Sequence, residues 1–120
     1  LSDEKYPPAD AYMALLYFRG SLVRENLFKA LELANRSNGK DDPLGMYVLA
    51  LLYFDGRVVD KDEIRGRKLM KEASIAGRPE AQLWIGDRFR EEGNLKEARQ
   101  AYQRCQDRLK TCQARLTLMA

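Results

Sequence analysis

The chain has 120 residues, of which 45% are hydrophobic and 32% charged, and it contains no histidine. This length suits one small domain with a modest core, and the lack of histidine excludes imidazole-based triads and dyads and zinc hydrolase sites. Lysine and arginine number 21 and aspartate and glutamate 18, so the net charge of +3 is too small to indicate nucleic-acid binding.

The sequence repeats itself at an offset of 36 residues. Segment 17–20, Tyr-Phe-Arg-Gly, aligns with segment 53–56, Tyr-Phe-Asp-Gly, without a gap. A third copy follows with Phe89 and Gly93 in the aromatic and glycine roles, and its internal spacing differs by one residue. Such periodicity predicts stacked structural units. We expect one repeat domain over 1–120, with copies at about 8–42, 43–78 and 79–110 and a capping helix at about 111–119.

Each copy is predicted to form two helices joined by a turn. In the second copy, Asp42 provides an N-cap and Pro43 takes the first helical position, where a missing N–H costs nothing. Gly56 ends this helix, because glycine tolerates positive φ. The next helix carries Ile64, Leu69, Met70, Ala73 and Ala76 as its apolar residues. The remaining boundaries are a cap at Asp60 or Asp62, a stop at Gly77 and a new start at Pro79.

A small residue precedes an aromatic by one turn in every first helix. Ala14, Ala50 and Gly86 hold the small position, and Tyr17, Tyr53 and Phe89 hold the aromatic one. We expect the aromatic to fill the space beside the small residue, opposite Ala30, Gly66 or Ala98 of the second helix. Tyr12, Val48 and Trp84 are bulky in all three copies and are expected to contact neighbouring repeats.

The second copy resembles the Sel-one-like repeat, a member of the tetratricopeptide-like superfamily. The residues that carry this resemblance are Leu49, Ala50, Tyr53, Gly56, Val59, Asp62, Gly66, Leu69, Ala73 and Gly77. The third copy is similar to a plain tetratricopeptide repeat at Ile85, Gly86, Phe89, Gly93, Ala98, Tyr102 and Cys105. The resemblance implies an all-α, right-handed α-solenoid of three helix-turn-helix repeats plus a C-terminal capping helix. It also implies binding to other proteins and no catalytic residues.

A partner-binding groove is predicted where successive first helices form the concave surface implied by the resemblance. Phe18 and Phe54 point about 100° away from their tyrosine neighbours, so they are free to line it with leucines three residues earlier. The groove becomes polar in the third copy. The predicted partner-binding residues are Leu15, Phe18, Arg19, Tyr47, Leu51, Phe54, Asp55, Asp87, Arg90 and Glu91. The alternative is that the apolar members pack between repeats.

Cys105 and Cys112 leave two interpretations open. On one unbroken helix their Cα atoms would lie about 10.5 Å apart, beyond the roughly 7 Å limit for a disulfide. A turn near Leu109 or Lys110 would allow a bridge that clips the capping helix to the last repeat. The alternative is a pair of buried thiols. A bridge indicates a bacterial periplasmic or secreted protein, and free thiols a cytoplasmic one.

The predicted function is a non-enzymatic module that binds a partner protein, as a bacterial envelope assembly, regulatory or effector-inhibiting factor. The alternative is a self-associating, homo-oligomeric scaffold. We expect no cofactor, no metal, no nucleic acid and no membrane span, since the densest apolar run, 47–54, is far shorter than the roughly 20 residues a span requires. We also expect a segment upstream of Leu1 to have been removed.

Overall fold

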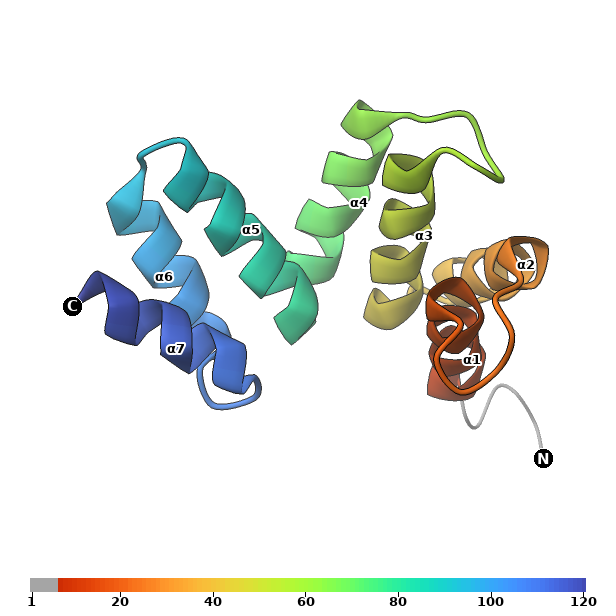
Figure 1. Ribbon diagram of the computed structural model, residues 1–120, viewed down its shortest axis with the longest axis horizontal. Coiled ribbons are helices and arrows are strands. Elements are labelled where there is room, and N and C mark those ends of the chain that lie inside the picture. Colours follow the sequence, from red (N-terminus) through yellow and green to blue (C-terminus); the bar gives the residue numbers. More distant parts are fainter. Residues whose placement is uncertain (1–6) are drawn as a thin grey trace. The chain divides into compact units, whose positions relative to one another are not determined.

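The computed structural model describes residues 7–120, and this part of the chain forms seven helices and no strand. The prediction of an all-α fold is therefore confirmed. The expectation about the segment before Leu1 lies outside the described residues. The helices are α1 (Pro7–Arg19), α2 (Leu27–Asn38), α3 (Pro43–Asp55), α4 (Glu63–Ile75), α5 (Pro79–Glu91), α6 (Leu95–Cys105) and α7 (Lys110–Met119) (Figure 1).

Local capping signals set the helix boundaries as the sequence predicts. The Asp42 side chain accepts a hydrogen bond from the Leu44 backbone N–H at 3.0 Å, with Pro43 opening α3. Gly56 follows the helix with φ of 76°, the left-handed conformation that a glycine stop provides. Of the two candidate caps for α4, it is Asp62 that accepts from a backbone N–H, that of Arg65, at 3.0 Å.

The chain folds into two compact units, one ending at Glu72 and the other running from Ala73 to Ala120. In the N-terminal unit, α1 and α3 lie side by side and both contact α2. In the C-terminal unit, α6 contacts both α5 and α7. In chain order the helices can be taken as the pairs α1/α2, α3/α4 and α5/α6, followed by α7, and the predicted three-repeat organisation stays a prediction.

Close helix approach in the N-terminal unit depends on Gly66 of α4. A Cβ atom added there would lie 2.5 Å from Cε1 of Phe54, so the phenylalanine ring covers the glycine. The prediction that Tyr53 takes this inward place is wrong. The ring of Tyr53 instead lies beneath the Arg65 guanidinium, whose carbon is 5.3 Å from the ring centroid. The aromatic residue that fills the space beside Gly66 is Phe54, the next residue in the sequence.

In the C-terminal unit a helix glycine again lies under an aromatic ring, but the helix that carries the glycine and the helix that carries the ring are exchanged. Gly86 now lies on the first helix of the pair, and a Cβ atom there would lie 2.6 Å from Cε1 of Tyr102 on α6. Tyr102 is completely buried, together with Cys105 and Cys112. The core of this unit therefore consists of one large aromatic side chain and two sulfur atoms among alanines.

Candidate functional site

One face of α3 carries three of the predicted partner-binding residues. Tyr47, Leu51 and Phe54 are spaced four and three residues apart, so they lie on the same side of the helix. All three are half-buried, whereas the other leucines of α3 and Val48 are buried. Solvent therefore reaches part of the predicted face at Tyr47 and Leu51, whereas the ring of Phe54 covers Gly66 of α4 and offers only its remaining surface.

The predicted partner-binding residues of α1 differ in exposure, since some lie at the surface and one lies in the core. Phe18 is half-buried and Arg19 is exposed at the end of the helix. Leu15 is only 7% exposed, so the expectation that it lines an accessible groove is corrected. Its counterpart Leu51 is half-buried, and a 36-residue offset therefore does not guarantee equal exposure. We name the half-buried residues Phe18, Tyr47, Leu51 and Phe54 the α1–α3 face.

Asp55 is committed to a charged network at the end of this face. Nε of Arg57 donates to its carboxylate at 2.8 Å, and the same guanidinium reaches Glu25, 3.2 Å away in the turn after α1. The hydrogen bond from Arg57 lowers the pKa of Asp55 below its ordinary value. The ion pairs fix the turn after α1 beside the turn after α3. Arg57 thus links the two turns, and Asp55 is already paired with it.

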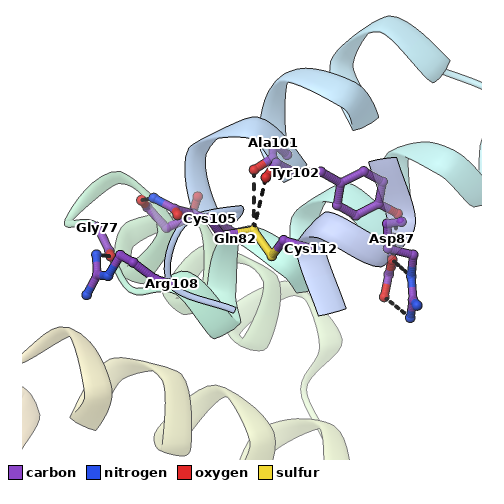
Figure 2. Close-up of a disulfide and its surroundings, with 10 residues drawn as sticks. Gly77, Gln82, Asp87, Ala101, Tyr102, Cys105, Arg108 and Cys112 are labelled. Carbon is purple, nitrogen blue, oxygen red and sulfur yellow. Dashed lines mark hydrogen bonds and ion pairs between the residues drawn. A yellow bond between two sulfur atoms is a disulfide. The ribbon is translucent and has the colours of Figure 1, made fainter. Parts of the chain in front are cut away.

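Asp87 is the centre of a second network, which ties three helices together (Figure 2). Tyr102 of α6 donates its hydroxyl to the Asp87 carboxylate at 2.6 Å, and Nε of Arg115 of α7 donates at 3.0 Å. Arg90 stands 3.9 Å from the same carboxylate. The structure therefore assigns Asp87 a structural role that its sequence position did not indicate.

The electrostatics of this network favour a charged Asp87 and a neutral Tyr102. Burial acts to raise the pKa of Asp87, but hydrogen bonds from Arg115 and Tyr102 and the nearby positive charges lower it below its ordinary value. Burial and the hydrogen bond to Asp87 raise the pKa of Tyr102 to about 12. At neutral pH the network therefore consists of an anion, a cation and a neutral hydroxyl donor.

The two remaining predicted residues lie at the C-terminal end of α5. Arg90 is exposed apart from its long contact with Asp87. Glu91 is exposed and accepts from Arg88, one turn earlier, at 2.7 Å. Both side chains are accessible to a partner, and their surroundings are charged rather than apolar.

A disulfide joins Cys105 to Cys112, with their Cα atoms 5.9 Å apart (Figure 2). Helix α6 ends at Cys105 and α7 begins at Lys110, so the intervening turn gives the reversal that a bridge requires. Arg108 within this turn donates to the Gly77 carbonyl oxygen at 2.7 Å. The beginning of α7 is thus covalently attached to the end of α6.

Sequence reasoning missed the roles of Arg108, Tyr102 and Arg115. Arg115 is 28 residues from Asp87, and no periodicity connects two such residues. The local signal in the sequence is that Arg115 lies next to apolar residues within the predicted capping helix.

Within residues 7–120, no group of three or more cysteine, aspartate or glutamate side chains is arranged to hold a metal ion. None of the helices in this range is both long enough and apolar enough to cross a membrane.

Known proteins place these features in a family. The Sel1 repeat model matches residues 7–38 and 43–77, together more than half of the chain. A crystal structure of a Sel1 repeat protein from Oxalobacter formigenes is similar with a TM-score of 0.79 at 22% identity, covering 93% of this chain and 48% of that one. Among curated proteins, none matches the sequence.

A second solved structure has the same fold over a smaller part of its length. It is a protective antigen present in uropathogenic Escherichia coli strains displaying an SLR fold, with a TM-score of 0.67, 24% identity, and coverage of 88% of this chain and 23% of that one. The chain thus spans about half and about a quarter of these two proteins. The α-solenoid class is shared with both. Sel1 repeats are in general protein–protein interaction modules, and the present chain belongs to the Sel1 repeat family.

Proposed function

We propose that the protein is a non-enzymatic interaction module that binds a partner protein on the α1–α3 face. The observation that carries this proposal is that Tyr47 and Leu51 are half-buried apolar side chains on one side of α3, beside the part of the Phe54 ring that does not cover Gly66. Apolar surface that stays in contact with water in the folded chain is available to stabilise a complex, at roughly 25 cal/mol per Å² buried. The neighbouring α1 adds Phe18 and the charge of Arg19.

The character of this face favours a partner with its own apolar anchor. Aromatic side chains such as Tyr47 and Phe54 supply large contact area with few rotatable bonds, and such residues carry much of the energy of protein interfaces. Arg19 stands exposed at one end, whereas Asp55 is already paired with Arg57. A partner would therefore meet an apolar centre with a positive charge at its edge.

We also propose that the protein acts outside the bacterial cytoplasm, in the periplasm or after secretion, as an assembly, regulatory or effector-inhibiting factor. The disulfide between Cys105 and Cys112 supports this, because structural disulfides persist in oxidising compartments and are rare in the cytosol. Both sulfur atoms are buried in the core, which suits a structural bridge better than a catalytic one.

The test compares partner capture by the wild-type chain and by the double variant Phe18→Ser/Leu51→Ser. We expect the variant to lose a protein that the wild-type chain retains from an extract of its own source. Leu118→Ser is the matched control, because Leu118 is 73% exposed on α7 and lies outside the α1–α3 face. Equal capture of that protein by both variants would contradict the proposal, provided that circular dichroism shows both to be folded.

Self-association is the second candidate function, and Tyr12 favours it. Tyr12 matches Val48 by the 36-residue offset, yet Val48 is 0% exposed and Tyr12 is 59% exposed. A position that is buried in one repeat and exposed in another offers a side chain that a second copy of the chain could cover. Light scattering over a range of concentrations should then show dimers that Tyr12→Ser abolishes. A monomer at all concentrations would exclude this candidate.

A further inference from the structure

Helix α4 carries a stripe of exposed residues that the α1–α3 face does not include. Ile64, Arg67, Lys68 and Lys71 are separated by three, one and three residues, so they occupy one arc of about 100° on the helix. All four side chains are exposed, and Ile64 is 84% exposed. We call these four residues the α4 basic stripe. All of them belong to the N-terminal unit.

The cations of the stripe are not neutralised within the part of the chain that the structure describes. Neighbouring acidic side chains are used elsewhere, since Asp62 accepts from the Arg65 backbone and Glu63 stands 3.6 Å from Lys61. Glu72 lies at the border of the arc and forms no ion pair with another described residue. Three positive charges on the stripe therefore meet at most one free carboxylate beside it.

The second helices of the other repeats do not show this combination. Counted from the N-cap, the matching residues of α2 are Phe28, Leu31, Glu32 and Asn35, and those of α6 are Lys96, Arg99, Gln100 and Gln103. Solvent exposure by itself accounts for charged residues on such a face. It does not account for Ile64, whose apolar side chain is 84% exposed and would be stabilised by burial.

We propose that the α4 basic stripe docks an acidic amphipathic helix of a protein partner. Glutamate or aspartate side chains at helical spacing would pair with Arg67, Lys68 and Lys71, and an apolar side chain one turn away would cover Ile64. Complementary charge would accelerate association and select acidic partners, and the apolar contact would slow dissociation. This site is separate from the α1–α3 face, so it goes beyond the function proposed above.

The test uses the full chain and a fluorescently labelled helical peptide of about 15 residues, with glutamates and leucines on one face. Fluorescence anisotropy gives its Kd. We expect Arg67→Glu/Lys68→Glu to weaken binding about tenfold or more, and Ile64→Ser to weaken it severalfold. Lys96→Glu/Arg99→Glu on α6 changes the net charge equally and should alter Kd by less than about twofold. Circular dichroism checks the fold, and Arg67→Gln/Lys68→Gln replaces the reversal variant if that one unfolds.

Three outcomes would overturn the proposal. One is equal loss of affinity in the α6 variant, which would show general attraction rather than a site. Another is equal binding of a peptide with the same composition in shuffled order. The third is that the stripe variants abolish binding to phosphatidylserine vesicles or to single-stranded oligonucleotide while the acidic peptide does not bind. Phe18→Ser/Leu51→Ser should leave peptide binding unchanged, which separates this test from that of the α1–α3 face.

Discussion

Single residues set how closely the helices of this protein approach one another. Gly66 and Gly86 each lie under an aromatic ring, of Phe54 and Tyr102 respectively. Glycine in a helix normally costs about 1 kcal/mol relative to alanine, so its presence at both places is explained by the space that the ring occupies. The glycine is on α4 in one pair and on α5 in the other, which shows that either helix of a repeat can provide the space.

Replacement of Gly66 by alanine should destabilise the protein. The added Cβ would stand 2.5 Å from the ring of Phe54, and we expect the overpacking to outweigh the better helix propensity and lower the free energy of unfolding by about 1–2 kcal/mol. Urea denaturation measures this change in the free energy of unfolding. Gly39→Ala is the control, because Gly39 has an ordinary helical φ of −63° and its Cβ would meet nothing closer than 3.5 Å. If both variants are equally stable, the ring does not determine the residue at position 66.

At the scale of elements, α7 is held by two different devices. The disulfide attaches its first turns to the end of α6, and Arg115 in its middle binds Asp87 of α5. Helix α7 has only ten residues and its N-cap, Leu109, makes no side-chain cap. A helix this short is marginal alone, so its stability comes from these contacts and from packing.

The double variant Cys105→Ser/Cys112→Ser tests the covalent device. Removal of a bridge that closes so short a loop should lower the free energy of unfolding by about 2–3 kcal/mol. The serine hydroxyl at position 105 is placed to reach the carbonyl oxygens of Ala101 and Tyr102, which lie 3.6 and 3.5 Å from the present sulfur. Denaturation of the wild-type protein with and without dithiothreitol is the parallel measurement. Unchanged stability in both would show that packing and the ion pair suffice.

The ion pair makes the stability of the protein depend on pH on the acidic side. The pKa of Asp87 is lower in the folded chain than its unfolded value near 3.9, so its contribution is complete above about pH 5. That contribution disappears as the pH falls through the folded pKa. Asp87→Asn should lower the free energy of unfolding at neutral pH by about 1–2 kcal/mol. In this variant the free energy of unfolding should also fall less steeply as the pH is lowered.

Urea denaturation at about pH 7 and about pH 3 measures this dependence. Asp107→Asn is the matched control, because Asp107 is exposed in the turn between α6 and α7. An acid dependence in Asp87→Asn as steep as that of the wild-type protein would contradict the role assigned to the carboxylate.

At the scale of the whole molecule, the disulfide is the feature that bears on where the protein works. If the protein folds in an oxidising compartment, Cys105 and Cys112 should both resist alkylation when protein isolated from its own source is unfolded without a reductant, and both should react when it is unfolded and reduced. Mass spectrometry counts the labels. Both samples are unfolded because both sulfur atoms are buried, and two labels without reduction would show free thiols and would favour the cytoplasm.

The sequence by itself determined the helices. The caps Asp42 and Asp62, the stop at Gly56 and the starts at Pro43 and Pro79 act within a few residues of themselves, so local chemistry suffices to place them. The offset of 36 residues then indicated the family. The sequence left open whether Cys105 and Cys112 form a disulfide. The answer also depends on local structure, because the turn between α6 and α7 brings the two cysteines together.

Only the tertiary structure decided which side chains face one another. Tyr53 and Phe54 are adjacent and similar, and the position of α4 selects Phe54 to cover Gly66. Leu15 and Leu51 hold the same place in two repeats, yet one is buried and the other half-buried because their neighbours differ. Asp87 and Arg115 meet across 28 residues, and Ile64 remains in solvent although it belongs to a predicted apolar set. Burial and ion pairing depend on what the rest of the chain places nearby, and a local pattern does not contain that information.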